Sequence, residues 1–358
     1  MHLLVDISAH GLGHLAQTAP VINALAAMVP GLRLTVRSAI PQHHLAHRIA
    51  ADFVHVAEAR DFGYVMHNAV DIDLAASARR YREFHADWAQ RVAEEAAWLR
   101  QHAVDALLSN VAYLPLAAAA EAGIPAAGLS SLNWAEMFAH YFAGEPWTPA
   151  IHAQILAAYG AGRCFLRLTP GLPMSDLPGR QEIAPIARLG RRDRALVARR
   201  LGLDAAQRWV LLAMGGMEFR PPLERWPHTP GLRWLVPGAW MLERQDAHAF
   251  DAATLDFSDL LASVDAVITK PGYGTFVEAA GSGIPILYLE RGDWPETPHL
   301  TDWLARNARA AMLTRGQLLA GDFVEVLQDL WRAPVPARPA TTGADDAARR
   351  LVKALGLS

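Results

Sequence analysis

The fold is decided by one stretch of the sequence, Val267-Ile268-Thr269-Lys270-Pro271-Gly272-Tyr273-Gly274-Thr275-Phe276-Val277-Glu278-Ala279-Ala280. A β-branched run predicts a strand that ends at Lys270, and the two glycines that follow it, Gly272 and Gly274, permit a tight loop. The next residues predict a helix that begins near Thr275. A strand, a short glycine-rich loop and a helix in this order are typical of a parallel α/β sheet.

The same loop has the features of an anion-binding site. The first turn of a helix carries backbone N–H groups without helical partners and the positive end of the helix dipole, which together attract a diphosphate. Glu278 lies one turn into the helix, where its carboxylate can accept hydrogen bonds from both hydroxyls of a ribose. The alternative is that Glu278 is only a surface residue of the helix and that Gly274 is needed only for packing. We predict phosphate contacts at Lys270, Gly272, Tyr273, Gly274 and Thr275.

A second glycine-rich turn, Gly11-Leu12-Gly13-His14, follows a strand predicted at 3–7 and opens a helix. Together with Ala16 it matches the dinucleotide pattern G-x-G-x-x-A, which by itself is a weak signal. The acidic residue that would bind the ribose of NAD is missing, because Arg37 stands near that position. A 2′-phosphate bound by Arg37 stays open as an alternative. His14 lies at the tip of this turn.

Short β-branched runs alternate with longer Ala- and Leu-rich stretches, which predicts parallel sheets with crossover helices. A chain of 358 residues exceeds a single core, so we expect two domains. We predict an N-terminal Rossmann-like domain over 1–180, a C-terminal one over 181–340, and a helix within 341–358 that crosses back to the first domain. Strands are expected at 3–7, 32–37, 105–108, 126–130, 165–168, 209–213, 233–236, 266–269 and 284–289, and helices at 14–28, 75–101, 113–122, 193–201 and 345–355.

The composition limits the class of protein. The sequence is 52% hydrophobic and 19% charged with a net charge of -3, which is ordinary for a globular protein and lacks the basic excess of a nucleic-acid-binding one. Cys164 is the only cysteine, which excludes an intrachain disulfide and a thiolate zinc cluster and predicts a buried, inert thiol. Uncharged apolar runs of about 18 residues are absent, so no transmembrane segment is expected. We expect a cytoplasmic protein and leave peripheral membrane contact open.

Several motifs together resemble a known family. They are similar to the glycosyltransferase-like N-terminal part of plant-type L-arabinokinases and, more distantly, to the MurG-type N-acetylglucosaminyltransferase of peptidoglycan synthesis. The resemblance spans almost the whole chain, but the kinase half of arabinokinase has no counterpart, so kinase activity is not carried over. The motifs are Gly11-Leu12-Gly13-His14, Asp105-Ala106-Leu107-Leu108-Ser109-Asn110, Asn133-Trp134, Phe165-Leu166-Arg167-Leu168, Gly272-Tyr273-Gly274-Thr275 with Glu278-Ala279, Ile284-Pro285, and Arg291, Asp293, Glu296, Pro298 and Leu300.

The resemblance implies a GT-B glycosyltransferase, in which two Rossmann-like domains with parallel sheets face each other across a cleft. It implies acceptor recognition by the N-terminal domain and nucleotide binding by the C-terminal one. By the same resemblance His14 is the catalytic or acceptor-positioning histidine, Glu278 is the ribose carboxylate, and Glu296 grips the donor sugar. Further contacts to the nucleotide sugar are implied for Gly13, Gly215, Gly216 and the loop from Gly272 to Thr275.

The expected chemistry is transfer of a hexosyl or N-acetylhexosaminyl group from a nucleoside-diphosphate sugar, with UDP as the expected nucleotide. The attacking hydroxyl needs a base, and a histidine suits this near neutral pH. The departing diphosphate needs N–H donors or positive charge, which the second loop and Lys270 can supply, so we expect no metal ion and no cofactor. The triplet Asp71-Ile72-Asp73 looks like a metal-binding D-x-D motif, but it precedes a predicted helix and is expected to cap it.

One departure from the family pattern keeps other functions open. Many enzymes of this type orient the histidine with an aspartate at the end of a mid-domain strand, and here Asn110 stands at that position. Asparagine can hold the ring but cannot stabilise an imidazolium electrostatically. A catalytically silent sugar-nucleotide-binding or regulatory protein, a sugar-nucleotide epimerase and a nicotinamide dehydrogenase therefore stay as alternatives. The sequence does not identify the acceptor as a small molecule, a lipid-linked molecule or a polymer.

Overall fold

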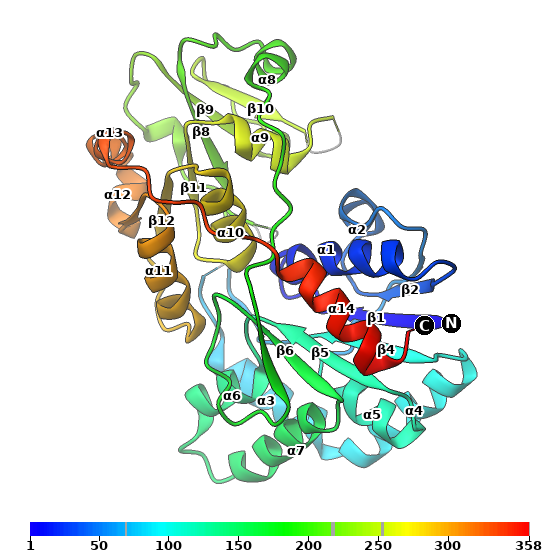
Figure 1. Ribbon diagram of the computed structural model, residues 1–358. Coiled ribbons are helices and arrows are strands. Elements are labelled where there is room, and N and C mark those ends of the chain that lie inside the picture. The colour runs from blue at the N-terminus through cyan, green and yellow to red at the C-terminus, as the bar shows by residue number, and fades with distance from the viewer. Residues whose placement is uncertain (69, 216–218, 252–253, 358) are drawn as a thin grey trace. The chain divides into compact units, whose positions relative to one another are not determined.

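Two separate parallel sheets organise the chain (Figure 1). The computed structural model describes residues 1–68, 70–215, 219–251 and 254–357. Unit 1 comprises Met1–His67, Asp71–Ile186 and Thr341–Ser358, and unit 2 comprises Asn68–Val70 and Ala187–Ala340. Each unit holds one of the sheets and is described by itself.

The sheet of unit 1 has seven parallel strands in the order β3-β2-β1-β4-β5-β6-β7. The strand order reverses between β1 and β4, and this switch point is where open α/β sheets bind ligands, beyond the carboxyl ends of the strands. Helices cover both faces, so the central strands are continuous apolar runs. The strands are β1 (His2–Ile7), β2 (Arg33–Arg37), β3 (Val54–Val56), β4 (Ala106–Asn110), β5 (Ala126–Ser130), β6 (Cys164–Leu168) and β7 (Arg180–Ile183).

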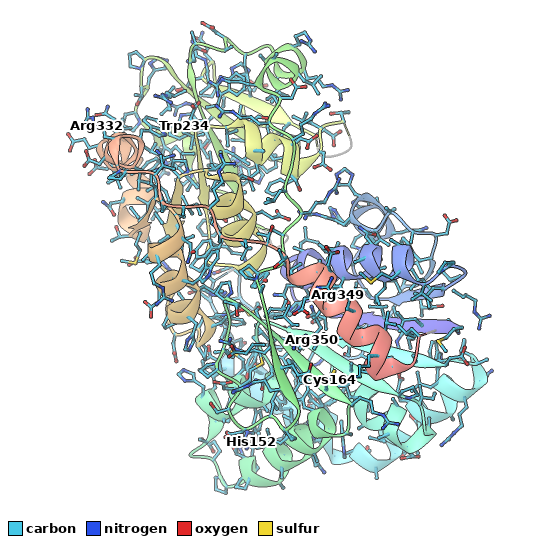
Figure 2. All side chains as sticks on the ribbon, viewed as in Figure 1. His152, Cys164, Trp234, Arg332, Arg349 and Arg350 are labelled. Carbon is cyan, nitrogen blue, oxygen red and sulfur yellow. The ribbon has the colours of Figure 1, made fainter. Side chains whose placement is uncertain are left out.

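The C-terminal helix of the chain belongs to unit 1. Helix α14 (Gly343–Leu355), red in Figure 1, packs against α1 (Gly13–Met28), and an antiparallel bridge joins Thr342 to Ile186. Figure 2 labels Cys164 on β6 and Arg350 on α14, and the predicted burial of Cys164 is confirmed. The other helices are α2 (Gln42–Arg48), α3 (Leu74–Ala86), α4 (Trp88–Gln101), α5 (Leu114–Ala122), α6 (Trp134–Phe142) and α7 (Thr148–Gly160).

The single helix predicted over 75–101 is wrong. The chain forms α3 and α4 instead, because Asp87 leaves the helical conformation with φ -113° and ψ 39° between them. The interpretation of Asp71-Ile72-Asp73 as a helix cap is confirmed, since a side-chain oxygen of Asp73 accepts a hydrogen bond from the Ala76 amide at 2.8 Å.

The sheet of unit 2 has six parallel strands in the order β10-β9-β8-β11-β12-β13, with its switch point between β8 and β11. The helix predicted at 193–201 is α8, α10 begins at Tyr273, two residues before the expected start, and α9, α11, α12 and α13 were not predicted. Strands and helices are β8 (Arg208–Ala213), β9 (Leu232–Pro237), β10 (Ala247–Phe250), β11 (Ala266–Thr269), β12 (Ile286–Leu289), β13 (Ala310–Leu313), α8 (Arg194–Leu201), α9 (Phe257–Ser263), α10 (Tyr273–Ser282), α11 (Glu296–Asn307), α12 (Arg315–Ala320) and α13 (Val324–Arg332), with 3₁₀ turns η1 (Leu223–Arg225) and η2 (Gly238–Trp240).

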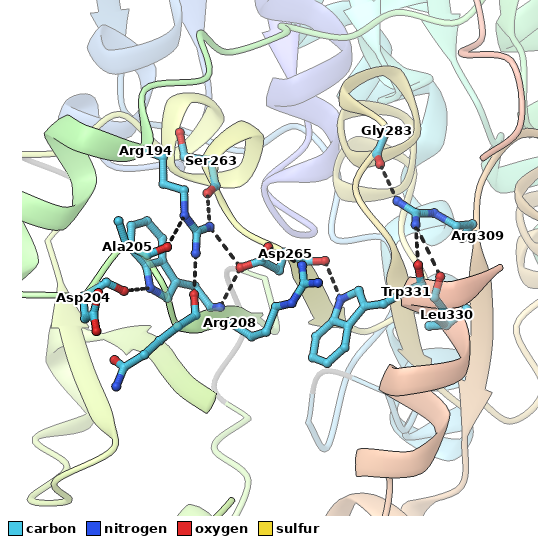
Figure 3. Close-up of polar contacts among 12 residues, drawn as sticks. Arg194, Asp204, Ala205, Arg208, Ser263, Asp265, Gly283, Arg309, Leu330 and Trp331 are labelled. Atoms are coloured by element: carbon cyan, nitrogen blue, oxygen red, sulfur yellow. Dashed lines mark hydrogen bonds and ion pairs between the residues drawn. The ribbon is translucent and has the colours of Figure 1, made fainter. Parts of the chain in front are cut away.

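Asp265 joins several elements at the amino end of the unit 2 sheet (Figure 3). Its carboxylate accepts hydrogen bonds from Arg194 at 2.9 Å and from Arg208 at 3.0 Å, and its backbone carbonyl accepts one from the Trp331 indole at 2.9 Å. The Trp209 amide also donates to the carboxylate at 2.8 Å. These contacts hold α8, β8 and α13 to the start of β11, at the opposite sheet edge from the loop after Thr269.

Every strand predicted from the sequence is present, and the structure adds β3, β7, β10 and β13. The two parallel sheets with covering helices confirm the predicted α/β class. In the part of the chain that the structure describes, no helix is long and apolar enough to cross a membrane.

Candidate active site

In unit 1, the turn after β1 places His14 at the switch point of the sheet. Gly11 takes φ +96°, a conformation that favours glycine, and α1 begins two residues later at Gly13. The Ser8 amide donates to the carbonyl of Asn110 at 2.6 Å, which ties this turn to the end of β4. His14 follows in the first turn of α1 and is 5% exposed.

The structure brings His14 and Asn110 together. Nδ1 of His14 lies 2.7 Å from Oδ1 of Asn110, which is fully buried. The Thr18 hydroxyl donates to the His14 carbonyl at 2.8 Å, so at Asn110 it can only accept, and the atom 2.8 Å from it is the amide nitrogen Nδ2. Asn110 therefore presents its oxygen to the imidazole, the proton sits on Nδ1, and Nε2 carries the lone pair.

Burial makes His14 a weak base. Desolvation lowers its pKa to about 4, and the hydrogen bond to Asn110 opposes this shift only in part. At neutral pH the ring is uncharged, which a proton acceptor requires, but it binds a proton less strongly than an ordinary histidine.

A tryptophan that borders His14 connects it to an unpredicted acid. Trp134 is fully buried, its ring centroid lies 6.1 Å from that of His14, and its indole donates to Asp61 at 2.7 Å. Burial raises the pKa of Asp61 to about 6, against hydrogen bonds from Trp134 and Ser8 that lower it. Sequence reasoning missed Asp61; the neighbouring Gly63 takes φ +57°, and an added Cβ there would lie 2.9 Å from His10 and 3.0 Å from Trp134.

The alternative that Arg37 binds a 2′-phosphate is not supported. Its side chain is buried and forms ion pairs with Asp6, at 2.6 Å, and with Glu95. Burial disfavours the charged guanidinium, but the charges and hydrogen bonds of Asp6 and Glu95 outweigh this and raise the pKa of Arg37. Two carboxylates already occupy the guanidinium, so Arg37 is a structural cation in unit 1.

In unit 2, the loop after β11 leads directly into α10. The first backbone bond of this helix runs from the Phe276 amide to the Gly272 carbonyl at 3.2 Å. Gly272 at the N-cap has no side chain to cap the helix, and a Cβ there would come no closer than 3.9 Å to another residue. The amides of Gly274 and Thr275 precede that first bond, and Thr275 is partly exposed. This is the geometry that holds anions at helix N-termini.

Lys270 and Gly215 lie side by side at the switch point of the second sheet. The Thr269 hydroxyl donates to the Ala213 carbonyl at 2.7 Å, which joins the carboxyl ends of β11 and β8. Gly215 takes φ +84°, and an added Cβ would lie 2.9 Å from Cε of Lys270. Burial lowers the pKa of Lys270 to about 8, with a further decrease from Arg291 and an opposing effect of Glu296. Gly216, the other glycine predicted in this loop, lies outside the described residues.

The two predicted carboxylates of unit 2 are both buried. Glu278 on α10 is 1% exposed, and Glu296, the first residue of α11, is 5% exposed. The Trp294 indole donates to Glu296 at 3.4 Å, and the Arg291 guanidinium stacks over the Trp294 ring at 3.8 Å from its centroid. Because its charge lowers the pKa of Lys270, Arg291 is a second cation near that lysine, and the sequence suggested it only through the family motif.

Comparison with solved structures identifies the fold. The glycotransferase of kitacinnamycin superposes with a TM-score of 0.66 at 16% identity, covering 99% of both chains. The fold is that of the GT-B glycosyltransferases. The spinosyn rhamnosyltransferase solved with thymidine diphosphate gives a TM-score of 0.55 at 17% identity over 99% of this chain and 96% of that one. A Listeria monocytogenes structure assigned as a UDP-N-acetylglucosamine 2-epimerase gives 0.57 at 13% identity, over 100% and 97%.

The chain is also similar in sequence to L-arabinokinase of Arabidopsis thaliana, at 25% identity over 326 residues. The match covers 90% of this chain but only 31% of that protein, in keeping with a resemblance to one part of it. No protein-family model matches the chain.

Proposed function

We propose that this protein is a glycosyltransferase that moves a hexosyl or N-acetylhexosaminyl group from a nucleoside-diphosphate sugar, UDP being the expected nucleotide, to an acceptor hydroxyl. The observation that carries the proposal is the uncapped N-terminus of α10 beside Lys270, at the switch point of a GT-B sheet. The thymidine diphosphate complex of the spinosyn rhamnosyltransferase supports a diphosphate ligand for a protein of this fold.

In the proposed reaction the acceptor oxygen attacks the anomeric carbon as its proton passes to Nε2 of His14. The bond from that carbon to the diphosphate oxygen breaks, and the diphosphate leaves with the electron pair. Asn110 keeps the Nδ1 proton in place and so fixes which nitrogen accepts. The amides of Gly274 and Thr275 and the ammonium of Lys270 stabilise the charge on the leaving group, so that the chain's own cations and amides serve in place of a metal ion. Glu278 binds the ribose and Glu296 the donor sugar.

The test combines ligand binding with turnover. Of UDP, TDP and GDP, at least one should raise the melting temperature of the protein, and NADP⁺ should not, because Arg37 is occupied. Slow hydrolysis of the matching nucleotide sugar should then depend on His14. Loss of hydrolysis in His14→Ala, with nucleotide binding retained, supports the proposed base. Unchanged hydrolysis in that variant excludes it.

A catalytically silent sugar-nucleotide-binding protein is the second candidate. It is favoured by the low pKa of His14 and by an asparagine where an aspartate would strengthen the base. A silent protein would bind a nucleoside diphosphate but release no nucleotide from any sugar conjugate, even with a panel of acceptors.

An epimerase is the third candidate, because the Listeria monocytogenes structure assigned to that activity shares the fold. Incubation with UDP-N-acetylglucosamine followed by proton NMR distinguishes it. Appearance of the C2 epimer without released UDP would replace the transferase proposal, and release of UDP without epimer would support it.

A further inference from the structure

Unit 1 contains a cavity whose lining includes neither His14 nor any residue proposed to bind the donor. Its volume is about 530 Å³, within the range of about 300–1,000 Å³ that small-molecule sites occupy. It lies between the segment 59–62, helices α3 and α4, and the start of α5. The residues that line it are Ala59, Arg60, Asp61, Phe62, Arg80, Glu83, Phe84, Arg91, Glu94, Glu95, Trp98 and Leu114.

Two of the guanidinium groups that line the cavity lie over aromatic rings. Arg80 lies over the ring of Phe62 at 5.3 Å, and Arg91 lies over the ring of Phe84 at 5.1 Å. Among the described residues neither arginine forms an ion pair, and Nε of Arg91 is buried without a hydrogen-bond partner. Arg91 is half-buried and Arg80 is exposed, and both keep N–H donors that a ligand in the cavity can use.

The floor of the cavity is fixed by an ionic network. Glu95 forms ion pairs with Arg37 and, at 2.7 Å, with Nε of Arg60. The Nη2 atom of Arg60 pairs with Glu58 at 2.8 Å. Because Glu95 is only 5% exposed and its charge is matched by two guanidinium groups, this network holds the wall of the site and adds little net charge to it.

The charges that line the cavity select against strongly charged ligands. Three arginines face four acidic residues, so an anion would meet the carboxylates and a cation would meet the guanidinium groups. Donors and acceptors nevertheless line the same cavity: Arg80 and Arg91 supply N–H groups, and Glu83 and Glu94 supply carboxylate oxygens. A hydroxyl group both donates and accepts, so a neutral molecule with several hydroxyls can satisfy both kinds of side chain at once.

We propose that this cavity of unit 1 is a binding site for a neutral saccharide. Its lining includes Asp61, which accepts the Trp134 indole hydrogen bond, but neither His14 nor any residue proposed to bind the donor. The arginine N–H groups donate to ring hydroxyl oxygens, and Glu83 and Glu94 accept from the hydroxyls.

The experiment is ligand-observed saturation-transfer NMR on the full chain. The probes are methyl glycosides of glucose, galactose, mannose and N-acetylglucosamine, recorded with and without saturating UDP. We expect a saturable signal for at least one probe that persists with UDP, because the site is not the donor site. Displacement of every probe by UDP, or no signal from any of them, would overturn the proposal.

A matched pair of variants locates the site. Arg80 and Arg82 are both exposed on α3, but only Arg80 lines the cavity, so Arg82→Ala is the matched control for Arg80→Ala. We expect about tenfold or greater weakening of probe binding in Arg80→Ala and none in Arg82→Ala. Equal affinity in the two variants would exclude this cavity. If glucose 6-phosphate binds more tightly than methyl glucoside, and Arg80→Ala removes this preference, the cavity is an anion site instead.

Discussion

Nδ1 of His14 lies 2.7 Å from Oδ1 of Asn110, and the amide nitrogen of the same asparagine lies 2.8 Å from the Thr18 hydroxyl. The asparagine thus fixes the tautomer of the histidine without adding a charge. An aspartate here would both orient the His14 ring and raise its basicity, whereas the asparagine only orients the ring. The fixed ring is consistent with a working base, and its low pKa with a slow one.

The substitution Asn110→Asp should keep the imidazole of His14 in place and add a negative charge beside it. A carboxylate beside the ring favours the imidazolium, so the pKa of His14 should rise above that in the parent protein. We expect faster donor hydrolysis at neutral pH, and the histidine Cε1–H signal in NMR titrations should move to higher pH. Asn23→Asp, on the outer part of α1, is the control and should leave both measurements unchanged. If the titration shifts but hydrolysis does not, His14 does not limit the rate.

Lys270 should take up a proton when the nucleotide binds. The pKa of this lysine is about 8 in the free protein, and a bound diphosphate raises it. Affinity for UDP should therefore fall as the pH rises through 8, a range in which the phosphates, with a second pKa of about 6, no longer titrate. Calorimetry in buffers of different ionisation enthalpy measures the uptake. Lys270→Met should abolish it and weaken binding about 10- to 100-fold, whereas the exposed Lys353→Met should change neither.

Gly215→Ala should separate backbone strain from a local clash. Gly215 and Gly231 take similar positive φ values, +84° and +78°, so alanine at either should cost about 1–2 kcal/mol of folding free energy. A Cβ at Gly215 would also push against Lys270, whereas at Gly231 it meets open space. Urea unfolding should give similar losses for the two variants, and only Gly215→Ala should bind UDP more weakly. Equal UDP affinities of the two variants would show that the Gly215 loop is not part of the phosphate site.

Arg37→Met should be strongly destabilising. It leaves the carboxylates of Asp6 and Glu95 buried without this partner, a change that typically costs about 3–5 kcal/mol. Arg33→Met, on the same strand but exposed, should cost far less. Urea unfolding measures both. A small effect in Arg37→Met would mean that the two carboxylates can take up protons or reach water.

The sequence predicted the strands with strong apolar patterns and missed those without them. β7 reads Arg180-Gln181-Glu182-Ile183 and lies at a sheet edge, where only one residue is buried. β13 reads Ala310-Ala311-Met312-Leu313 and has no β-branched residue, so its composition favours a helix. Both form strands because a neighbouring strand offers an open edge, which is information that a local pattern does not contain.

The candidate site was predictable where glycines mark it. The loops at Gly11 and Gly272 could be located because each glycine follows a β-branched strand. The acid Asp61 could not, since its raised pKa comes from burial next to Trp134, a residue 73 positions away. The pairing of Arg37 with Glu95 is equally long-range, and it converts an apparent ligand-binding arginine into a structural one.

Acid should destabilise the protein through its buried histidines. His14 and His85 both have a pKa of about 4 in the folded state against 6.5 as free side chains, so the unfolded chain binds more protons between these values and stability falls as the pH drops from 6.5 to 4. Asp61, with a raised pKa of about 6, acts in the opposite direction over about pH 4–6 and offsets one of the two. His85→Gln, which keeps a donor and an acceptor near Gln154 and Tyr113, should flatten the dependence by up to about 1.4 kcal/mol per pH unit. Urea unfolding midpoints between pH 4 and 6.5 measure this dependence, and His43→Gln at an exposed histidine is the control. An unchanged slope in His85→Gln would mean that His85 is already protonated in the folded protein.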